Sequence, residues 1–164
     1  PGTRHQRCWF HKSSNVLNKF PKSMAPAVTS DLKDIHHAET KAAARAAIVV
    51  FKEKYEVKFA PAVTCLTKDA EAMLTFFDYP AEHWDHLRTS NPVESVFDTV
   101  RHRTVRTKGA MSQKTVKLMV LTLMRAASKT WRRLNGANQM PRVIEGVKSI
   151  DGVATTDPAK TNAA

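Results

Sequence analysis

The chain has 164 residues, an ordinary hydrophobic content of 42 %, a formal net charge of +11 and an isoelectric point of about 10. This length suits one domain with one core, and the charge favours an anionic partner (nucleic acid first, an anionic membrane surface second) over a basic protein with no partner. Two cysteines, Cys8 and Cys65, exclude a disulfide framework, and the sequence shows no signal peptide or membrane span, so we expect no membrane partner and a cytoplasmic, nucleoid-associated location.

Helices dominate the predicted secondary structure, because strand-like alternation is nearly absent and glycine occurs only five times. In the first half of the chain we expect four helices, over about residues 8–20, 23–38, 40–55 and 62–77. Pro21, Pro61 and Pro80 mark the expected boundaries of these helices, since proline rarely continues a helix. Thr40 is the expected N-cap of the third helix. The second helix carries apolar residues at spacings of three and four: Val28, Leu32, Ile35 and Ala38.

The second half of the chain begins with a helix-start pattern. Asn91 is a good N-cap, Pro92 suits the first helical position, and Glu94 follows the cap by three residues. This helix should reach about Arg103, and Ser112 should cap a longer one over residues 113–134. The longer helix has an apolar stripe at helical spacing: Val116, Met119, Val120, Leu123, Met124, Ala127 and Trp131. We expect a short helix over residues 142–147 and a disordered tail over 153–164.

Basic residues concentrate in the second half of the chain. From Thr99 to Ile144 there is no Asp or Glu but there are eleven Lys and Arg, a number equal to the whole net charge. The candidate DNA-phosphate contacts in this run are Arg101, Arg103, Arg106, Lys108, Lys114, Arg132 and Arg133. If about six groups of this run bind phosphates, the logarithm of the binding constant should fall with that of the salt concentration at a slope of roughly −5. The alternative is a solvated basic face with no partner.

Glu94 lies shortly before this run and can be explained in two ways. Its place three residues after Asn91 completes a capping box, which accounts for it without any chemistry. Beside a basic cluster, the carboxylate could instead help to hold a metal ion while arginines hold phosphates. Asp98, one turn further on, could share that cation or pair with Arg101 or His102.

Two pairs of potential metal ligands suggest a second kind of site. Cys8 and His11 form a Cys-x-x-His pair, and His83 and His86 form a His-x-x-His pair far along the chain. Together the four could bind zinc, as in a structural zinc-binding helical protein. Cys8 and His11 could alternatively form a thiol nucleophile with its base, although that needs a third orienting group. The structural alternative has Cys8 and Phe10 packed inward and His11 in a local hydrogen bond.

Several separated segments resemble, in the same order, the Mutator family of bacterial insertion-sequence transposases. The run Arg88-Thr89-Ser90-Asn91-Pro92-Val93-Glu94-Ser95-Val96-Phe97 resembles the signature around the last acidic residue of that family. Further segments that resemble it are residues 6–12, 66–69, 77–84, 106–109, 131–136 and 143–148. The similarity covers about residues 3–152.

The resemblance implies a mainly α chain that is the C-terminal part of a ribonuclease H-like α/β catalytic domain. Such a domain carries a helical insertion and uses two Asp and one Glu to hold two divalent ions, Mg²⁺ or Mn²⁺. Glu94 matches the Glu and would be the catalytic residue and metal ligand, whereas both Asp and the early sheet strands are missing. Cys8, His11 and Asn91 would help to order the neighbourhood of the site.

The resemblance also implies a division of the chain and a function. Residues 1–12 would end the core segment, 13–87 would form the insertion, and 88–152 would carry the catalytic helix and a basic helical part. The intact DDE transposase would bind and cut the ends of an insertion element, join them to target DNA, and self-associate. Because two carboxylates are missing, and because the chain opens at Pro1 without an initiator Met, we expect a piece of that enzyme that is inactive alone. The alternative is a non-enzymatic, helical DNA-binding remnant.

Overall fold

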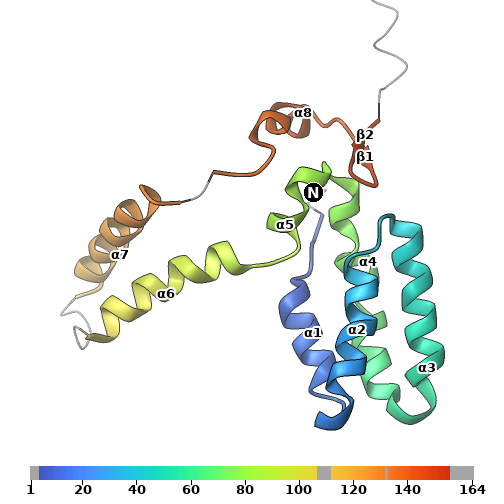
Figure 1. The fold of residues 1–164 in the computed structure, drawn as a ribbon. Helices are drawn as coiled ribbons and strands as arrows, with labels where there is room; N and C mark the ends of the chain where they lie inside the picture. The colour runs from blue at the N-terminus through green and yellow to red at the C-terminus, as the bar shows by residue number, and fades with distance from the viewer. Residues whose placement is uncertain (1–3, 107–111, 132, 156–164) are drawn as a thin grey trace, which may run out of the picture. The chain divides into compact units, whose positions relative to one another are not determined.

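The computed structural model describes residues 4–106, 112–131 and 133–155 of the chain. It divides into two compact units: unit 1 is built from the residues up to Thr89 together with those from Asn135 onward, and unit 2 is Ser90–Leu134 (Figure 1). The described residues form eight α-helices, four short 3-10 helices and one two-stranded sheet. The predicted mainly α content is therefore confirmed. None of the described helices is long and apolar enough to cross a membrane.

Unit 1 carries most of the secondary structure (Figure 1). Its α-helices are α1 Trp9–Leu17, α2 Ala25–His36, α3 Lys41–Thr67, α4 Ala70–Met73, α5 Trp84–Leu87 and α8 Met140–Ile144. Its 3-10 helices are η1 Lys22–Met24, η2 Thr75–Asp78, η3 Ala81–His83 and η4 Ala137–Gln139. The strands β1 Ser149–Ile150 and β2 Val153–Ala154 pair antiparallel. Unit 2 consists of α6 Asn91–Arg106 and α7 Gln113–Ser128.

The first three helices of unit 1 enclose a hydrophobic core. Val28, Leu32 and Ile35 are buried, which confirms these positions of the predicted apolar face. The fourth, Ala38, is half-buried and lies beyond the end of α2. Aromatic side chains of α3 fill the centre, where the rings of Phe51 and Tyr55 lie 4.8 Å apart. The buried core also includes Trp9, Val16, Phe20, Ala44, Ile48, Ala62, Val63, Leu66, Met73, Leu74, Phe76 and Phe77.

Helix α3 begins as predicted but does not end as predicted. The Thr40 hydroxyl accepts a hydrogen bond from the Ala43 N–H at 3.1 Å, which confirms the N-cap. The expected break into two helices at Pro61 is wrong, because α3 continues through that residue to Thr67. The chain instead kinks at Phe59, whose φ of −134° and ψ of 42° are not helical. Proline removes one helical hydrogen bond and crowds the preceding turn, so a kink is sufficient when both halves pack on the same core.

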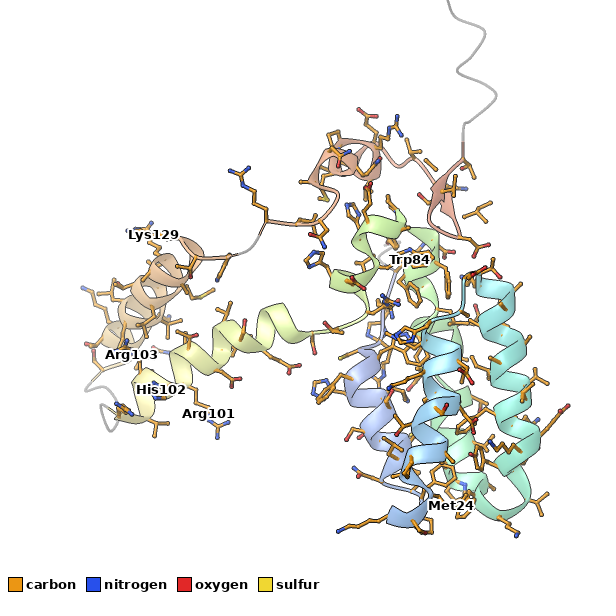
Figure 2. The ribbon with its side chains drawn as sticks, viewed as in Figure 1. Met24, Trp84, Arg101, His102, Arg103 and Lys129 are labelled. Atoms are coloured by element: carbon orange, nitrogen blue, oxygen red, sulfur yellow. The ribbon has the colours of Figure 1, made fainter. Side chains whose placement is uncertain are left out.

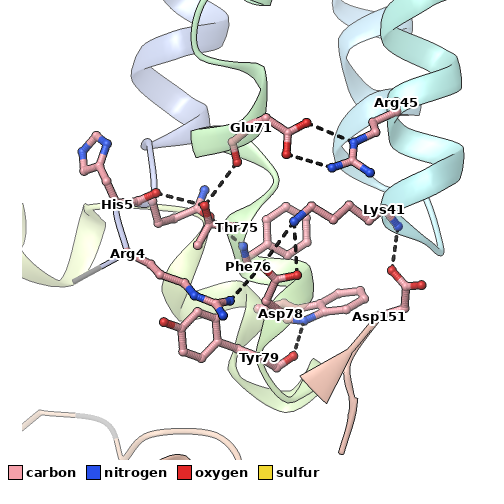
Figure 3. Close-up of polar contacts among 12 residues, drawn as sticks. Arg4, His5, Lys41, Arg45, Glu71, Thr75, Phe76, Asp78, Tyr79 and Asp151 are labelled. Carbon is pink, nitrogen blue, oxygen red and sulfur yellow. Dashed lines mark hydrogen bonds and ion pairs between the residues drawn. The ribbon is translucent and has the colours of Figure 1, made fainter. Parts of the chain in front are cut away.

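The C-terminal part of unit 1 folds back onto the turn after α4. The Gly152 N–H donates to the Phe77 carbonyl at 3.2 Å, and the Ala81 N–H donates to the Gly152 carbonyl at 3.1 Å. Asp151 accepts from the Lys41 N–H at 2.7 Å and so caps the first turn of α3 (Figure 3). The expected tail therefore starts too early, since Val153–Ala154 is a strand, and residues 156–164 lie outside the described part.

In unit 2, both helices start close to their predicted positions. The helical assignment of α6 begins at Asn91, one residue before the expected first position, and the Ser90 carbonyl accepts from the Glu94 N–H at 3.0 Å. The Ser112 side chain accepts from the Thr115 N–H at 3.2 Å, which confirms the predicted cap of α7.

Helix α7 ends at Ser128, well before the predicted residue 134. The N–H groups of Lys129 and Thr130 donate to carbonyls three residues back, which tightens the last turn. The hydroxyls of Ser128 and Thr130 also donate to the carbonyls of Arg125 and Ala127, at 2.9 Å each. Hydroxyl groups that compete for helix carbonyls in this way favour a helix end.

Unit 2 has little core of its own. Helices α6 and α7 pack on one another. The predicted α7 stripe is no more than half-buried, at Met119, Val120, Leu123 and Ala127. No residue of α7 is fully buried. Its other large apolar side chains, including Leu118 and Leu121, are exposed.

Candidate nucleic-acid interface

Glu94 lies in the first turn of α6 and is partly exposed. The Ser90 hydroxyl donates a hydrogen bond to its Oε1 atom. Ser90 thus holds this carboxylate, whereas the side chain of Asn91, the predicted cap, lies outside the described part. A carboxylate oriented at a helix start can support the helix dipole and can also present oxygen atoms to a cation.

The three arginines of α6 are exposed but lie on different sides of the helix. At about 100° per residue, Arg101 falls within roughly 20° of the direction of Glu94, whereas Arg103 falls on the opposite side and Arg106 between them. Figure 2 shows Arg101 and Arg103 leaving α6 in different directions. The basic run therefore surrounds the helix, and only Arg101 shares the face that carries Glu94.

The remaining predicted phosphate contacts are only partly described. Lys114, in the first turn of α7, and Arg133, beyond its end, are both exposed. Lys108 and Arg132 lie outside the described residues. The Lys129 side chain, near the end of α7, is also exposed (Figure 2).

The two units differ in how their cations are neutralised. In unit 1, basic side chains pair with carboxylates; Arg45 and Glu71, for example, form a two-pronged contact with distances of 3.0 and 2.8 Å (Figure 3). In the described part of unit 2, no carboxylate pairs with Arg101, Arg103 or Arg106. The ion pairs found among the described residues also do not include Asp98 with Arg101 or His102, which the sequence had left open. An external anion would supply the missing negative charge.

The Cys8 and His11 pair lies at the start of α1. The expectation that Phe10 packs inward is wrong: Phe10 is 63 % exposed, and Trp9 is the buried residue. The indole of Trp9 donates to the Met73 carbonyl at 2.9 Å, which fixes the start of the helix against the core. Cys8 is half-buried, and both Cys8 and His11 line a pocket of about 360 Å³.

The four residues of the possible zinc site do not come together. Among the described residues, no group of three or more Cys, His, Asp or Glu could hold a metal ion. His83 and His86 instead hold the returning chain, because the His83 Nε2 atom lies 2.9 Å from the Gly136 carbonyl and the His86 Nε2 atom accepts from the Asn135 N–H at 3.1 Å.

One charged residue that the sequence reasoning passed over is Lys12, which is only 2 % exposed. Its ammonium group donates to the Cys65 carbonyl at 2.8 Å and to the carboxylate of Asp69. The hydrogen bond from Lys12 holds the pKa of the Asp69 carboxyl below its usual range. The sequence does contain a sign of this ion pair. Trp9, Lys12 and Val16 have helical spacing, and a lysine on such an apolar face needs an acidic partner when it is buried.

A family model and two similar curated proteins point to the same family. The family model described as "Transposase, Mutator family" matches residues 1–134. The chain is 40 % identical, over 153 residues, to the transposase for insertion sequence element IST2 of Acidithiobacillus ferrooxidans, covering 93 % of this chain and 52 % of that protein. It is 43 % identical, over 146 residues, to the transposase for insertion sequence element IS6120 of Mycolicibacterium smegmatis, covering 89 % of this chain and 45 % of that protein. The chain thus spans about half the length of these curated relatives.

Proposed function

Since the chain belongs to the Mutator family of transposases, we propose that it supplies one catalytic carboxylate, Glu94, and a DNA-binding basic surface to an enzyme that cuts and joins DNA. The observation that carries this proposal is the family match over residues 1–134 with Glu94 at the start of α6, shortly before the acid-free basic run. In the proposed reaction the ends of an insertion element are cut, and each freed 3′ hydroxyl attacks target DNA.

Glu94 fits one part of the metal site that the family implies. Mg²⁺ and Mn²⁺ take carboxylate oxygens as ligands, and Glu94 has a partly exposed carboxylate oriented by Ser90. The described residues do not assemble a complete site, since no group of three possible ligands gathers among them. We therefore assign Glu94 as one ligand, assign no cutting step to this chain alone, and place the two Asp in the part of the longer relatives that it does not span.

The basic residues would hold the DNA backbone by charge. We propose phosphate contacts for Arg101, Arg103, Arg106, Lys108, Lys114, Arg132 and Arg133. The absence of carboxylate partners on the described arginines of α6 supports this assignment. Binding by such groups is nearly independent of base sequence and weakens steeply with salt, because each phosphate contact releases condensed counterions.

The exposed apolar surface of unit 2 supports the proposal that α6 and α7 belong to a larger catalytic domain. No residue of α7 is fully buried, and two of its leucines are largely exposed: Leu118 at 55 % and Leu121 at 48 %. Apolar helix faces of this kind normally lie against another layer of structure. We propose that α6 and α7 cover the sheet of a ribonuclease H-like domain and that the helices over residues 13–87 are its insertion.

The family resemblance carries several further proposals. Cys8, His11 and Asn91 would support the active-site neighbourhood, two Mg²⁺ or Mn²⁺ ions would act in the intact enzyme, and the enzyme would self-associate on its DNA. Its location would be the bacterial nucleoid.

The test is DNA binding and Mn²⁺-dependent nicking by this chain, alone and joined to the preceding half of a family transposase that carries the two Asp. We expect binding in both forms and nicking only in the completed form, and Glu94→Gln should abolish nicking while binding survives. Glu53→Gln, at an exposed position of α3, is the matched control and should leave both unchanged. Binding without nicking in either form would leave the DNA-binding remnant, with Glu94 reduced to a helix cap.

A further inference from the structure

A second basic site lies in unit 1, in the pocket beside the start of α1. This pocket has a volume of about 360 Å³, and its lining includes His5, Arg7, His11 and Lys12. None of the described residues that line it is acidic. Its position on a different unit from α6 and its basic lining make it a candidate anion site that the proposed role of α6 does not explain.

The charge of the pocket is only partly neutralised. Asp69 pairs with both Arg7 and Lys12: it binds the Lys12 ammonium and lies 3.3 Å from the Nε atom of Arg7. Two cations thus share one carboxylate. The two Nη nitrogens of Arg7 make no hydrogen bond among the described residues, and the side chain is 46 % exposed. Arg7 therefore has donors left over for a ligand, while the buried Lys12 adds a fixed positive charge.

The backbone that carries Arg7 is fixed to the rest of unit 1. The Thr75 hydroxyl donates to the His5 carbonyl at 3.0 Å, and the Arg7 N–H donates to the Ala72 carbonyl at 2.8 Å. The Gln6 side chain accepts from the Phe76 N–H at 2.8 Å. Figure 3 shows the His5 imidazole pointing away from this polar network. The pocket lining is therefore held in place before any ligand arrives, which lowers the entropy cost of binding.

The chemistry of these side chains fits a phosphate oxygen. A guanidinium edge binds two oxygens of a phosphate at once, and an ammonium group adds donors and charge. We propose that this pocket binds a phosphodiester group of DNA, in addition to the phosphates held by the arginines of α6. The inference rests on the proposed function, because that function makes DNA the phosphate source.

Arg7→Gln tests the proposal, and Arg4→Gln is its matched control. Arg4 precedes Arg7 by three residues, has a nearly equal exposure of 48 %, and pairs with Asp78 at 2.9 Å (Figure 3). Binding of a short fluorescent DNA duplex is measured at a series of KCl concentrations. We expect Arg7→Gln to weaken binding several-fold and to reduce the salt slope by about 0.9. Arg4→Gln should leave the slope unchanged, and Arg7→Lys, which keeps the charge, should retain most of it.

The ring proton NMR signals of His5 and His11 give a local readout. Inorganic phosphate and the duplex should both shift these signals in the unaltered chain and in Arg4→Gln, and far less in Arg7→Gln. An unchanged salt slope in Arg7→Gln, or a shift with inorganic phosphate but not with the duplex, would overturn the DNA assignment of the pocket. If the duplex does not bind the unaltered chain at all, the proposed function fails as well. Loss of binding only with Arg101→Gln and Arg103→Gln would overturn the pocket and leave that function standing.

Discussion

At the scale of single residues, the arginines of α6 differ in what they can reach. Arg101 and Arg103 leave α6 in different directions (Figure 2). By helix geometry, Arg101 lies on the side that carries Glu94 and Arg103 on the opposite side. Replacement of either arginine by glutamine removes one positive charge. We therefore expect Arg101→Gln and Arg103→Gln each to reduce the salt slope of DNA binding by about 0.9.

Nicking should separate the two arginines. In the completed enzyme, Arg101→Gln should lower the Mn²⁺-dependent nicking rate measured at saturating DNA, because only Arg101 would hold a phosphate beside Glu94. Arg103→Gln should leave that rate within about twofold. Equal losses of rate would contradict the assignment of the Glu94 face to the reacting DNA.

His36 gives unit 1 a dependence of stability on pH in the mildly acidic range. Burial first, and then the nearby Arg88 guanidinium, lower its pKa from 6.5 to about 4. His37 acts in the same direction and Asp85 opposes it. The ring lies 5.1 Å from that of Trp9 in an edge-on contact, so protonation would place a charge against the core.

The free energy of unfolding should therefore fall as the pH drops from about 6.5 to 4, because in this window the unfolded chain binds a proton that the folded chain does not. Above that window both states are neutral and His36 has no effect. We expect a loss of about 1–2 kcal/mol, once the partial exposure of the ring is allowed for. Urea unfolding at several pH values measures it, and the difference between the unaltered chain and His36→Gln isolates this residue from the carboxylates. A difference that does not change with pH would contradict the lowered pKa.

At the scale of elements, the sequence predicts where helices start better than where they end. Thr40 and Ser112 start α3 and α7 through side-chain caps, which are local contacts between residues three positions apart. The passage of α3 through Pro61 and the attachment of the β1–β2 hairpin to η2 depend on contacts with distant segments. The β1–β2 pairing itself is local, since Ile150 pairs with Val153. No short window of the sequence contains the distant contacts, so a local pattern could not predict them.

The same limit applied to the candidate site. Glu94 and the acid-free run stand out in the sequence, since charge and helix-start patterns are local. Lys12 and Asp69 are far apart in the chain and meet only in the fold, so their ion pair and the pocket beside it needed the structure. The resemblance to a family added what neither charge nor periodicity could supply, namely the kind of reaction.

The turn that brings the C-terminal strands back onto η2 depends on Gly152. Its φ is +84°, and a Cβ atom there would lie 2.7 Å from the Cβ of Ala81 and 2.9 Å from the Trp84 ring. Gly146 has nearly the same φ, +81°, with nothing within 4 Å of such an atom. The pair therefore separates backbone strain from close packing.

We expect Gly146→Ala to cost about 1 kcal/mol through the positive φ alone. Gly152→Ala should cost roughly 1–3 kcal/mol more, because the new methyl group must displace the contact with Ala81 and Trp84. Thermal unfolding of both variants measures the difference. Equal losses in the two variants would show that the strands do not press on η3 and α5 as the structure has them.

At the scale of the whole molecule, the two units differ in what stabilises them. Unit 1 buries aromatic and aliphatic side chains from α1, α2 and α3 around one core and pairs several of its cations, such as Arg45 and Lys54, with its own carboxylates. In unit 2, no residue of α7 is fully buried, and the described arginines of α6 have no carboxylate partners. Ser90–Leu134 nevertheless holds both Glu94 and most of the basic run. The unit to which we assign DNA binding and catalysis is thus the one that buries less of its apolar surface.

Hydrogen exchange should reveal this difference directly. In the free chain, amides of α2 around Leu32 and Ile35 should exchange only by global unfolding, whereas amides of α6 and α7 should exchange through local openings of much lower free energy. A DNA duplex at low salt should slow exchange in α6 and α7, since a ligand that binds only the folded helices stabilises them by mass action. The α2 amides serve as the internal control, and high salt should remove the added protection. If α7 amides are already as slow as those of α2 without DNA, and speed up on dilution, then a second copy of the chain covers the apolar face, and the DNA-dependent ordering argued here is wrong.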